Sequence, residues 1–370
     1  MLSSSRTDVL AYLNEFEPDA VRTRKHRSKF VRGRFYSAGP REIVSFDQHD
    51  KWRYYGLFLH LGLDPFTGEF LWVKIYWTNR NPVLITSYYL EAMRRDGGIP
   101  LLTFSDPGGE NNGIANVQST IHQRLDPNLA GTVQHKWFFD KMNIKSEIGW
   151  SIIRQNFAPG FEALMDKGET MGYIDFKTPT PVETFLFRWL AIPWLQKELD
   201  AWVDRFNNSP RRANKHKILP KGIPTHIRQN PERFNSHDYM VRVPNDLFDE
   251  MEQIWSPPNH PVFQLTCPPF EDFVQTFYDE LGSPPVSIET FWPTYIALKA
   301  RFRQLGRPVH NEFATAFQRE EDVFEQEVAL QGEVNDLEEE FVDDLLFSDG
   351  EGNSEDETED YLLLYTDDET

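Results

Sequence analysis

Cysteine is almost absent from this chain, which has only Cys267 in 370 residues. A single thiol excludes an internal disulfide and a cysteine-ligated zinc site, and it is typical of proteins from a reducing compartment. No apolar run approaches the roughly 20 residues needed to cross a bilayer. The opening residues also lack the apolar core of a signal peptide. We therefore expect a soluble, intracellular protein with no zinc and no membrane association.

Basic residues are missing from one end of the chain. The segment from Glu320 to Thr370 has no lysine or arginine but holds 22 of the 58 acidic residues. The rest of the chain is near neutral, with 36 acidic and 38 basic residues, so the net charge of -20 does not exclude nucleic acid as a partner. We expect 308–370 to be an acidic, largely disordered tail. Two interpretations of it stay open: a solubilising tail, or a segment that recruits a protein partner.

Near the other end, basic residues are crowded. Seven fall within thirteen positions: Arg22, Arg24, Lys25, Arg27, Lys29, Arg32 and Arg34. Such a run is typical of polyanion binding or nuclear import, and a solvated arm without a ligand is equally common. We treat 1–40 as a basic N-terminal extension outside the main core.

The pattern of apolar residues and turn signals predicts three strands, a helix, a strand, a helix, a strand and a helix. The strands are expected at 43–47, 54–63, 70–77, 100–104 and 131–137, and the helices at 81–95, 115–125 and 143–157. Pro159 and Gly160 are expected to end the third helix. A long helix at 181–207 follows, and then 231–307, where paired prolines predict an appended region of short helices. The fold class is α/β, with a mixed five-stranded sheet flanked by helices.

Three carboxylates occupy informative places in this order. Asp106 follows a buried strand and precedes Pro107 and two glycines; by itself this is most often a turn. Asp47 ends the first strand, and Glu147 lies in the first turn of the third helix. If the first and fourth strands are neighbours, their ends bring the two aspartates together and the helix adds Glu147. A two-metal site needs such a group of carboxylates, because two close divalent ions must be neutralised.

The chain resembles the integrase-core proteins of eukaryotic, especially fungal, mobile elements, which share the ribonuclease-H-like fold of retroviral integrases and many transposases. The resemblance covers about residues 35 to 230, and Asp106 and Glu147 are separated by forty residues, close to the spacing of that family. Four segments carry it: Phe46-Asp47-Gln48-His49-Asp50-Lys51, Phe104-Ser105-Asp106-Pro107-Gly108-Gly109-Glu110-Asn111, Asn143-Ile144-Lys145-Ser146-Glu147-Ile148-Gly149-Trp150 and Phe206-Asn207-Asn208-Ser209-Pro210-Arg211.

The resemblance implies a ribonuclease-H-like domain at 41–230 that joins DNA strands. It implies that Asp47 bridges two Mg²⁺ ions, that Asp106 holds one and that Glu147 holds the other, with Mn²⁺ as a substitute. It also implies a homo-oligomer on DNA. The presumed substrate and the basic arm together predict the nucleus, or otherwise the cytoplasm.

Contacts with DNA are expected from the basic arm and from residues in the matching segments: Arg24, Lys25, Arg27, Lys29, Arg32, Arg34, Asn143, Lys145, Arg211 and Arg212. Relatives commonly have Asp-Gly-Asn-His-Lys where this chain has Asp-Gln-His-Asp-Lys, so Asp50 competes with Asp47 as the first ligand. We favour Asp47, because it directly follows the strand. Two other hypotheses stay open: a nuclease without strand transfer, and a domesticated or decayed core that binds DNA or protein without catalysis.

Overall fold

The computed structural model describes residues 12, 15–18, 35–138, 143–211, 218–320 and 322–323. The chain forms two units, Met1–Phe35 and Tyr36–Thr370. In the first unit the rings of Tyr12 and Phe16 pack with their centroids 4.7 Å apart. The expected basic arm lies outside the described residues, so its DNA contacts remain predictions. All elements below belong to the second unit.

A five-stranded mixed sheet forms the centre of this unit. Its strands are β1 (Ile43–His49), β2 (Phe58–Asp64), β3 (Glu69–Tyr76), β5 (Leu102–Ser105) and β6 (His135–Trp137). Their order is β3-β2-β1-β5-β6. β1 pairs antiparallel with β2, and β2 with β3, whereas β1–β5 and β5–β6 are parallel. The predicted α/β class and mixed five-stranded sheet are confirmed.

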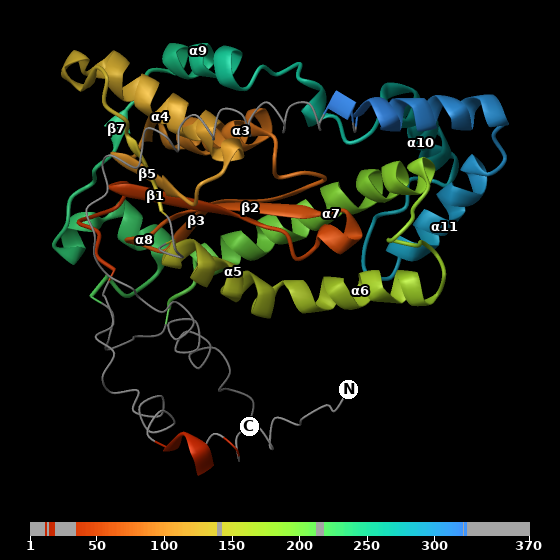
Figure 1. Ribbon diagram of the computed structural model, residues 1–370, viewed down its shortest axis with the longest axis horizontal. Helices are drawn as coiled ribbons and strands as arrows, with labels where there is room; N and C mark the ends of the chain where they lie inside the picture. The colour runs from red at the N-terminus through yellow and green to blue at the C-terminus, as the bar shows by residue number, and fades with distance from the viewer. Residues whose placement is uncertain are drawn as a thin grey trace. The chain divides into compact units, whose positions relative to one another are not determined.

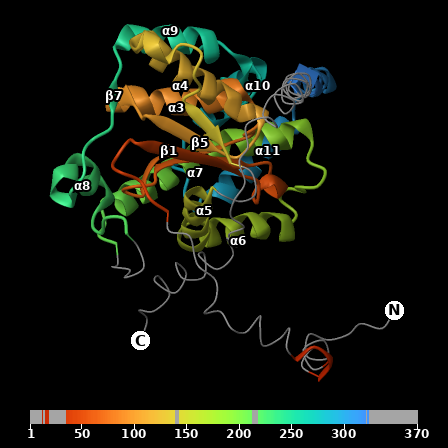
Figure 2. The same cartoon turned by 60° about the vertical axis from the view of Figure 1, so that its left-hand side comes forward.

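Helices cover both faces of the sheet, as Figures 1 and 2 show. On one face lie α3 (Pro82–Asp96) and α4 (Asn112–Leu125); on the other lie α5 (Ile144–Asn156) and α7 (Pro181–Asn207). α3 begins where expected, because the Asn81 side chain accepts hydrogen bonds from two backbone N–H groups of the first turn. It ends at Gly97, whose φ of 77° favours glycine.

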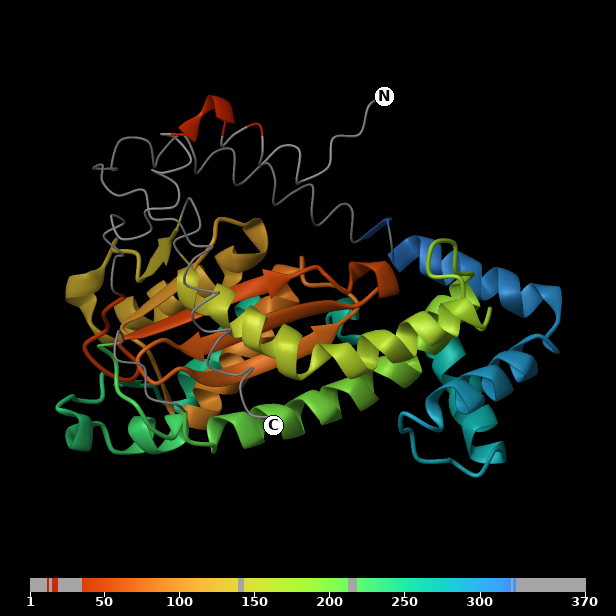
Figure 3. The same cartoon turned by 90° about the horizontal axis from the view of Figure 1, so that it is seen from below.

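The helix expected at 143–157 ends before Pro159 and Gly160, as predicted, since α5 stops at Asn156. A second helix, α6 (Ala158–Thr170), was not expected, and only Phe157 separates it from α5. Pro159 stands in the first turn of α6, where a backbone N–H has no intrahelical partner to lose. Figure 3 shows α5, α6 and α7 together on one side of the sheet.

The region after residue 230 is helical, as predicted, but it shares the core of the sheet domain. Its helices and those that flank it are α8 (Pro224–Gln229), α9 (Asn245–Trp255), α10 (Pro268–Glu280) and α11 (Phe291–Phe302). A small second sheet, β4 (Gly98–Ile99) with β7 (Val241–Arg242), joins the two parts of the chain. Buried side chains from Val44 to Phe313 form one hydrophobic cluster. The boundary expected at residue 230 therefore does not separate two cores.

The tail begins later than expected. Residues 307–320 are helical, and Phe313 is fully buried in the shared core. Residues 324–370 lie outside the description, so the expected disorder there stays a prediction. Single 3-10 turns complete the described chain: η2 (Arg53–Tyr55), η3 (Gly109–Asn111), η4 (Pro127–Leu129), η5 (Pro231–Phe234) and η6 (Pro261–Phe263). None of the described helices is long and apolar enough to span a membrane.

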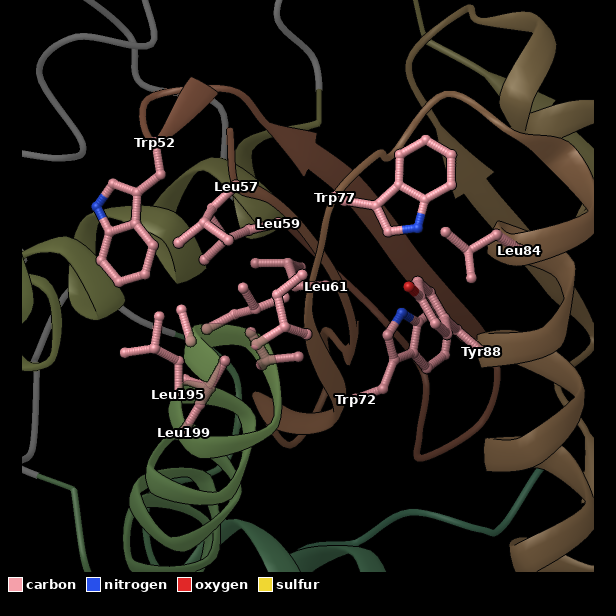
Figure 4. Close-up of a cluster of buried hydrophobic side chains, with 14 of the residues drawn as sticks. Trp52, Leu57, Leu59, Leu61, Trp72, Trp77, Leu84, Tyr88, Leu195 and Leu199 are labelled. Carbon is pink, nitrogen blue, oxygen red and sulfur yellow. The ribbon is translucent and has the colours of Figure 1, made fainter. Parts of the chain in front are cut away.

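The core fills both spaces between the sheet and its helices. Figure 4 shows Leu195 and Leu199 of α7 on one side, and Leu84 and Tyr88 of α3 on the other. All four side chains are at most 8% exposed. This packing fixes the sheet, so the ends of its strands hold their side chains in defined places.

Candidate functional site

Asp47 and Asp106 lie near the carboxyl ends of two neighbouring strands of the sheet, β1 and β5. β1 and β5 are parallel neighbours, with Ser45 opposite Phe104. Asp47 does not end β1 as expected, because the strand continues to His49. Two residues further along the same register, Asp47 comes level with Asp106, which follows the last residue of β5. Adjacent strands are about 4.8 Å apart. The parallel pairing that the sequence could only suppose therefore brings the two aspartates together.

α5 lies close to the sheet because Gly149 has no side chain. A Cβ atom at this position would lie 3.1 Å from Phe70 and 3.3 Å from both Leu61 and Leu63. The start of the helix is fixed as well, since Ser45 Oγ bonds Ser146 Oγ at 2.8 Å and Asn143 Nδ2 donates to the Phe46 carbonyl at 2.9 Å. These contacts hold the first turn of α5, which carries Glu147, against the strand of Asp47.

Trp150 connects α5 directly to Asp47. Its indole Nε1 donates to Asp47 Oδ2 at 3.0 Å, and the backbone N–H of Gln48 donates to Oδ1 at 2.9 Å. Glu147 lies three residues before Trp150, so both side chains are on one face of the helix. That face is turned toward the edge of the sheet that carries Asp47.

The three acids repel one another. Burial, together with the negative charges of Asp106 and Glu147, raises the pKa of Asp47 to about 8. Burial also raises the pKa of Asp106. Each of the three residues is half-buried rather than sealed from solvent. Each negative charge makes ionisation of the neighbouring carboxyl groups less favourable. A bound cation would offset this repulsion, so the three acids together favour cation binding.

The donor set fits Mg²⁺ bound by few protein ligands. All three side chains offer carboxylate oxygens, which this ion prefers, and Asp106 Oδ1 is a buried atom that bonds no other described group. Within the described ranges, no three His, Cys, Asp or Glu side chains are close enough to hold one ion together. Mg²⁺ commonly uses one or two carboxylates and completes its shell with water and substrate phosphate, so a tighter cluster is not required.

Two predicted DNA contacts need correction. Asn143 is 2% exposed, and its side chain bonds Ser45, the Phe46 carbonyl and Asp106, so it supports α5 and Asp106 from inside the fold and is not available to DNA. Arg211 stacks on Phe206, 4.1 Å from the ring centroid, and donates to the carbonyl of Gly68. Gly68 follows Asp64 in the β2–β3 turn, at the end of the sheet opposite Asp47, so Arg211 lies far from the acids.

Two further predicted contacts stay untested. Lys145 is half-buried in the first turn of α5, next to the acids, where its contact with DNA remains a prediction. Arg212 lies outside the described residues.

The sequence interpretation did not single out two cations near His49, two residues after Asp47. Lys51 follows β1 and Arg154 lies on α5; both are exposed, and the charge of Arg154 contributes to lowering the pKa of Lys51, after burial. Arg154 is seven residues after Glu147, which places both on one helix face. The seven-residue spacing from Glu147 could have pointed to Arg154. A single arginine in a helix is usually a solvated side chain, however, so the spacing alone is weak evidence.

Asp50, the alternative first ligand, has its own partners. It accepts a hydrogen bond from Asn79 Nδ2 at 2.8 Å and lies 3.7 Å from the guanidinium of Arg80. Asp47 thus remains the better match to the acid pair. His49 packs on Trp150, with ring centroids 4.8 Å apart, and burial lowers its pKa to about 4, so it is neutral at physiological pH.

His135 does not flank the acids but supports the sheet behind them. Its two ring nitrogens bond Thr103 Oγ1 at 2.8 Å and Ser105 Oγ at 3.1 Å, and it is 6% exposed. Burial lowers its pKa from 6.5 to about 3. The histidine is therefore a structural residue whose two ring nitrogens are both hydrogen-bonded.

Neutral His135 predicts a loss of stability in acid. Between pH 6.5 and about 3 the unfolded chain binds a proton that the folded chain excludes, so stability is full above pH 6.5 and falls as the pH decreases. Between pH 7.5 and pH 5, wild type should lose about 2 kcal/mol more than His135→Gln, which has no proton to gain. Urea unfolding at the two pH values measures this; equal losses would contradict it.

No family model and no curated protein matches the chain. The functional conclusion below therefore depends on the fold, on the site and on the resemblance of the short segments.

Proposed function

We propose that this protein is a Mg²⁺-dependent DNA strand-transfer enzyme of the integrase and transposase type, with a ribonuclease-H-like core and Asp47, Asp106 and Glu147 as its metal ligands. The observation that carries the proposal is the pairing of β1 with β5, which sets Asp47 beside Asp106 while α5 adds Glu147. The order of the central strands and their helices agrees with the one predicted from apolar residues and turn signals.

When bound, two divalent ions supply an activated water or 3'-hydroxyl nucleophile and stabilise the leaving oxygen. Asp47 would hold both ions, Asp106 one and Glu147 the other. Trp150 and the Gln48 N–H fix the orientation of Asp47, since each donates to one of its two oxygens. Little other side-chain chemistry is needed, because phosphoryl transfer depends mainly on positioning and charge.

Lys51 and Arg154 are the proposed phosphate contacts of the core. Exchanging both for alanine should weaken DNA binding and make it less sensitive to salt, by about one unit of the log–log slope for each lost phosphate contact. Titrations of a labelled duplex at several KCl concentrations measure the slope. The matched control is Arg124→Ala, an exposed arginine paired with Glu250 at the distal end of α4. A double variant with the wild-type slope would remove this role.

The direct test of the enzyme is the joining of labelled duplex ends to a plasmid in Mg²⁺ or Mn²⁺. Cleavage without joining would favour a nuclease, and DNA binding without either reaction would favour the non-catalytic hypothesis.

A further inference from the structure

Gln48 lies next to Asp47 in β1, and its side chain is on the opposite face of the sheet. Successive residues of a strand alternate between the two faces. Asp47 therefore meets Trp150 of α5, whereas Gln48 reaches the segment between Ser105 and α4 on the side of α3 and α4. This segment, Asp106–Asn111, carries the second acid of the site.

Regular sheet pairing does not hold Asp106. β5 ends at Ser105, whose carbonyl accepts from Phe138 N–H at 2.8 Å. After Asp106 come Pro107, which has no N–H to donate, and two glycines, which allow the backbone many conformations. Contacts beyond the strand must therefore fix the position of Asp106.

Three hydrogen bonds connect this segment to Gln48. The Asp106 carbonyl also accepts from Ser105 Oγ at 2.9 Å, and the Asn143 side chain hydrogen-bonds the Asp106 side chain. Gln48 Nε2 donates to Glu110 Oε1, and it also donates to Asn111 Oδ1 at 3.2 Å. Asn111 Nδ2 in turn donates to the backbone carbonyl of Asp106 at 3.0 Å. Asn111 is 1% exposed, so its amide group has little access to water as a replacement partner. A single side chain of β1 is thereby joined, through Asn111, to the backbone of Asp106.

We propose that Gln48 is a positioning residue for the metal site: it connects the strand of Asp47 to the segment of Asp106 and so sets the separation of the two metal ligands. Asp47 receives the Gln48 backbone N–H on one oxygen, and Asp106 is held through the Gln48 side chain. Gln48 is thus hydrogen-bonded directly to Asp47 and, through Asn111, to the backbone of Asp106. The inference rests on the proposed function, because it assigns the geometry of the same metal site.

The first test is a titration of the full chain with Mn²⁺ in the absence of DNA. Electron paramagnetic resonance measures how much Mn²⁺ is bound. Gln48→Ala should weaken Mn²⁺ binding about tenfold, the usual effect of losing a residue that orients a ligand. Gln48→Met removes the same donors at nearly the same side-chain length and should behave alike, which excludes a packing defect as the cause. The control is Gln123→Ala, where Nε2 of a half-buried glutamine of α4 donates to the Thr132 carbonyl at 2.8 Å, away from the acids.

A second test exchanges the side chains of Gln48 and Glu110 and measures Mn²⁺ binding again. Gln48→Glu alone sets a carboxylate against Glu110 and should weaken Mn²⁺ binding more than Gln48→Ala. Adding Glu110→Gln restores a donor and an acceptor between the two positions, so the double variant should bind Mn²⁺ more tightly than Gln48→Glu. A residue important only for folding would not show this rescue at an unchanged melting temperature. In joining assays, the Mn²⁺ concentration at half-maximal rate should rise more than the maximal rate falls.

The outcomes separate this inference from the function on which it rests. Wild type that takes up no Mn²⁺ would overturn the proposed metal site, and the role of Gln48 with it. Wild type that binds Mn²⁺ while Gln48→Ala and Gln48→Met bind it equally well would overturn the role of Gln48 alone. Absence of rescue in the double variant would also count against the connection between Gln48 and Glu110.

Discussion

Asp106→Asn should reduce the rate of metal-dependent joining of DNA ends by about a thousandfold or more. This is the usual effect of removing a group that stabilises the transition state at the reaction centre. The amide keeps the size of the carboxylate but removes its charge. The proposed ions would then lose one anionic ligand, while Asp47 and Glu147 alone would face the remaining positive charge. The measurement is the initial rate of joining at saturating Mg²⁺ and at saturating Mn²⁺.

The same substitution should leave the fold intact or stabilise it. Burial raises the pKa of Asp106, so its charged form is unfavourable in the protein, and the charge of Asp106 also raises the pKa of Asp47. A neutral amide removes both costs. We expect an unchanged or higher melting temperature together with the lost activity, which a misfolded variant would not show.

The matched control is Asp126→Asn. Asp126 is exposed and caps the η4 turn through a hydrogen bond from Asn128 N–H, a role that asparagine also fills. This variant should join DNA like wild type. Equal joining rates for wild type and Asp106→Asn would leave only the non-catalytic hypothesis.

The elements that position the acids were predictable from local signals. Asp47 and Asp106 each follow a short apolar run, and Asn81 and Gly97 mark the two ends of α3 with standard capping residues. Pairing of β1 with β5 was a supposition, because register between distant strands depends on how the whole sheet packs. It became informative only when Asp47 and Asp106 were found side by side.

The errors have a common physical cause. Asn143 and Arg211 are polar residues in the resembling segments, and from the sequence they were expected on the surface. In the fold they satisfy buried or half-buried backbone carbonyls, those of Phe46 and Gly68. Pro159 was expected only to end a helix, but it also stands in the first turn of α6, a helix that was not predicted from the sequence. Tertiary contacts decided each case, and single-residue patterns do not contain them.

Asn207 shows the same effect in another matching segment. Its side-chain amide exchanges two hydrogen bonds with the backbone of Phe70, at 3.0 and 2.8 Å, on the outer edge of β3. Gln196 of α7 does the same for Val73 and Ile75, at 2.9 and 2.8 Å. The amides of α7 thereby occupy the open edge of the sheet and block pairing with another strand. In this segment Asn207 therefore has a structural role at the edge of β3.

Arg228→Met should destabilise the protein by about 3–5 kcal/mol, the usual cost of removing one partner from a buried ion pair. Arg228 is 8% exposed; it forms an ion pair with Asp96 and lies 3.4 Å from Glu69 Oε1. Its positive charge also opposes the rise that burial causes in the pKa of Asp64 and of Glu69. Methionine fills much of the space but leaves three acids with less compensation. Urea or thermal unfolding at pH 7.5 measures the loss.

Acid should relieve this loss, which distinguishes uncompensated charge from a packing defect. Without Arg228, the folded-state pKa values of Asp64 and Glu69 should rise further above their unfolded values. The folded variant then binds more protons than the unfolded chain, so its stability increases relative to wild type as the pH falls through those folded-state values. The control, Arg124→Met, breaks an exposed pair with Glu250 and should cost at most about 1 kcal/mol. A deficit in Arg228→Met that stays constant from pH 7.5 to pH 5 would show that methionine packing, and not charge, destabilises the variant.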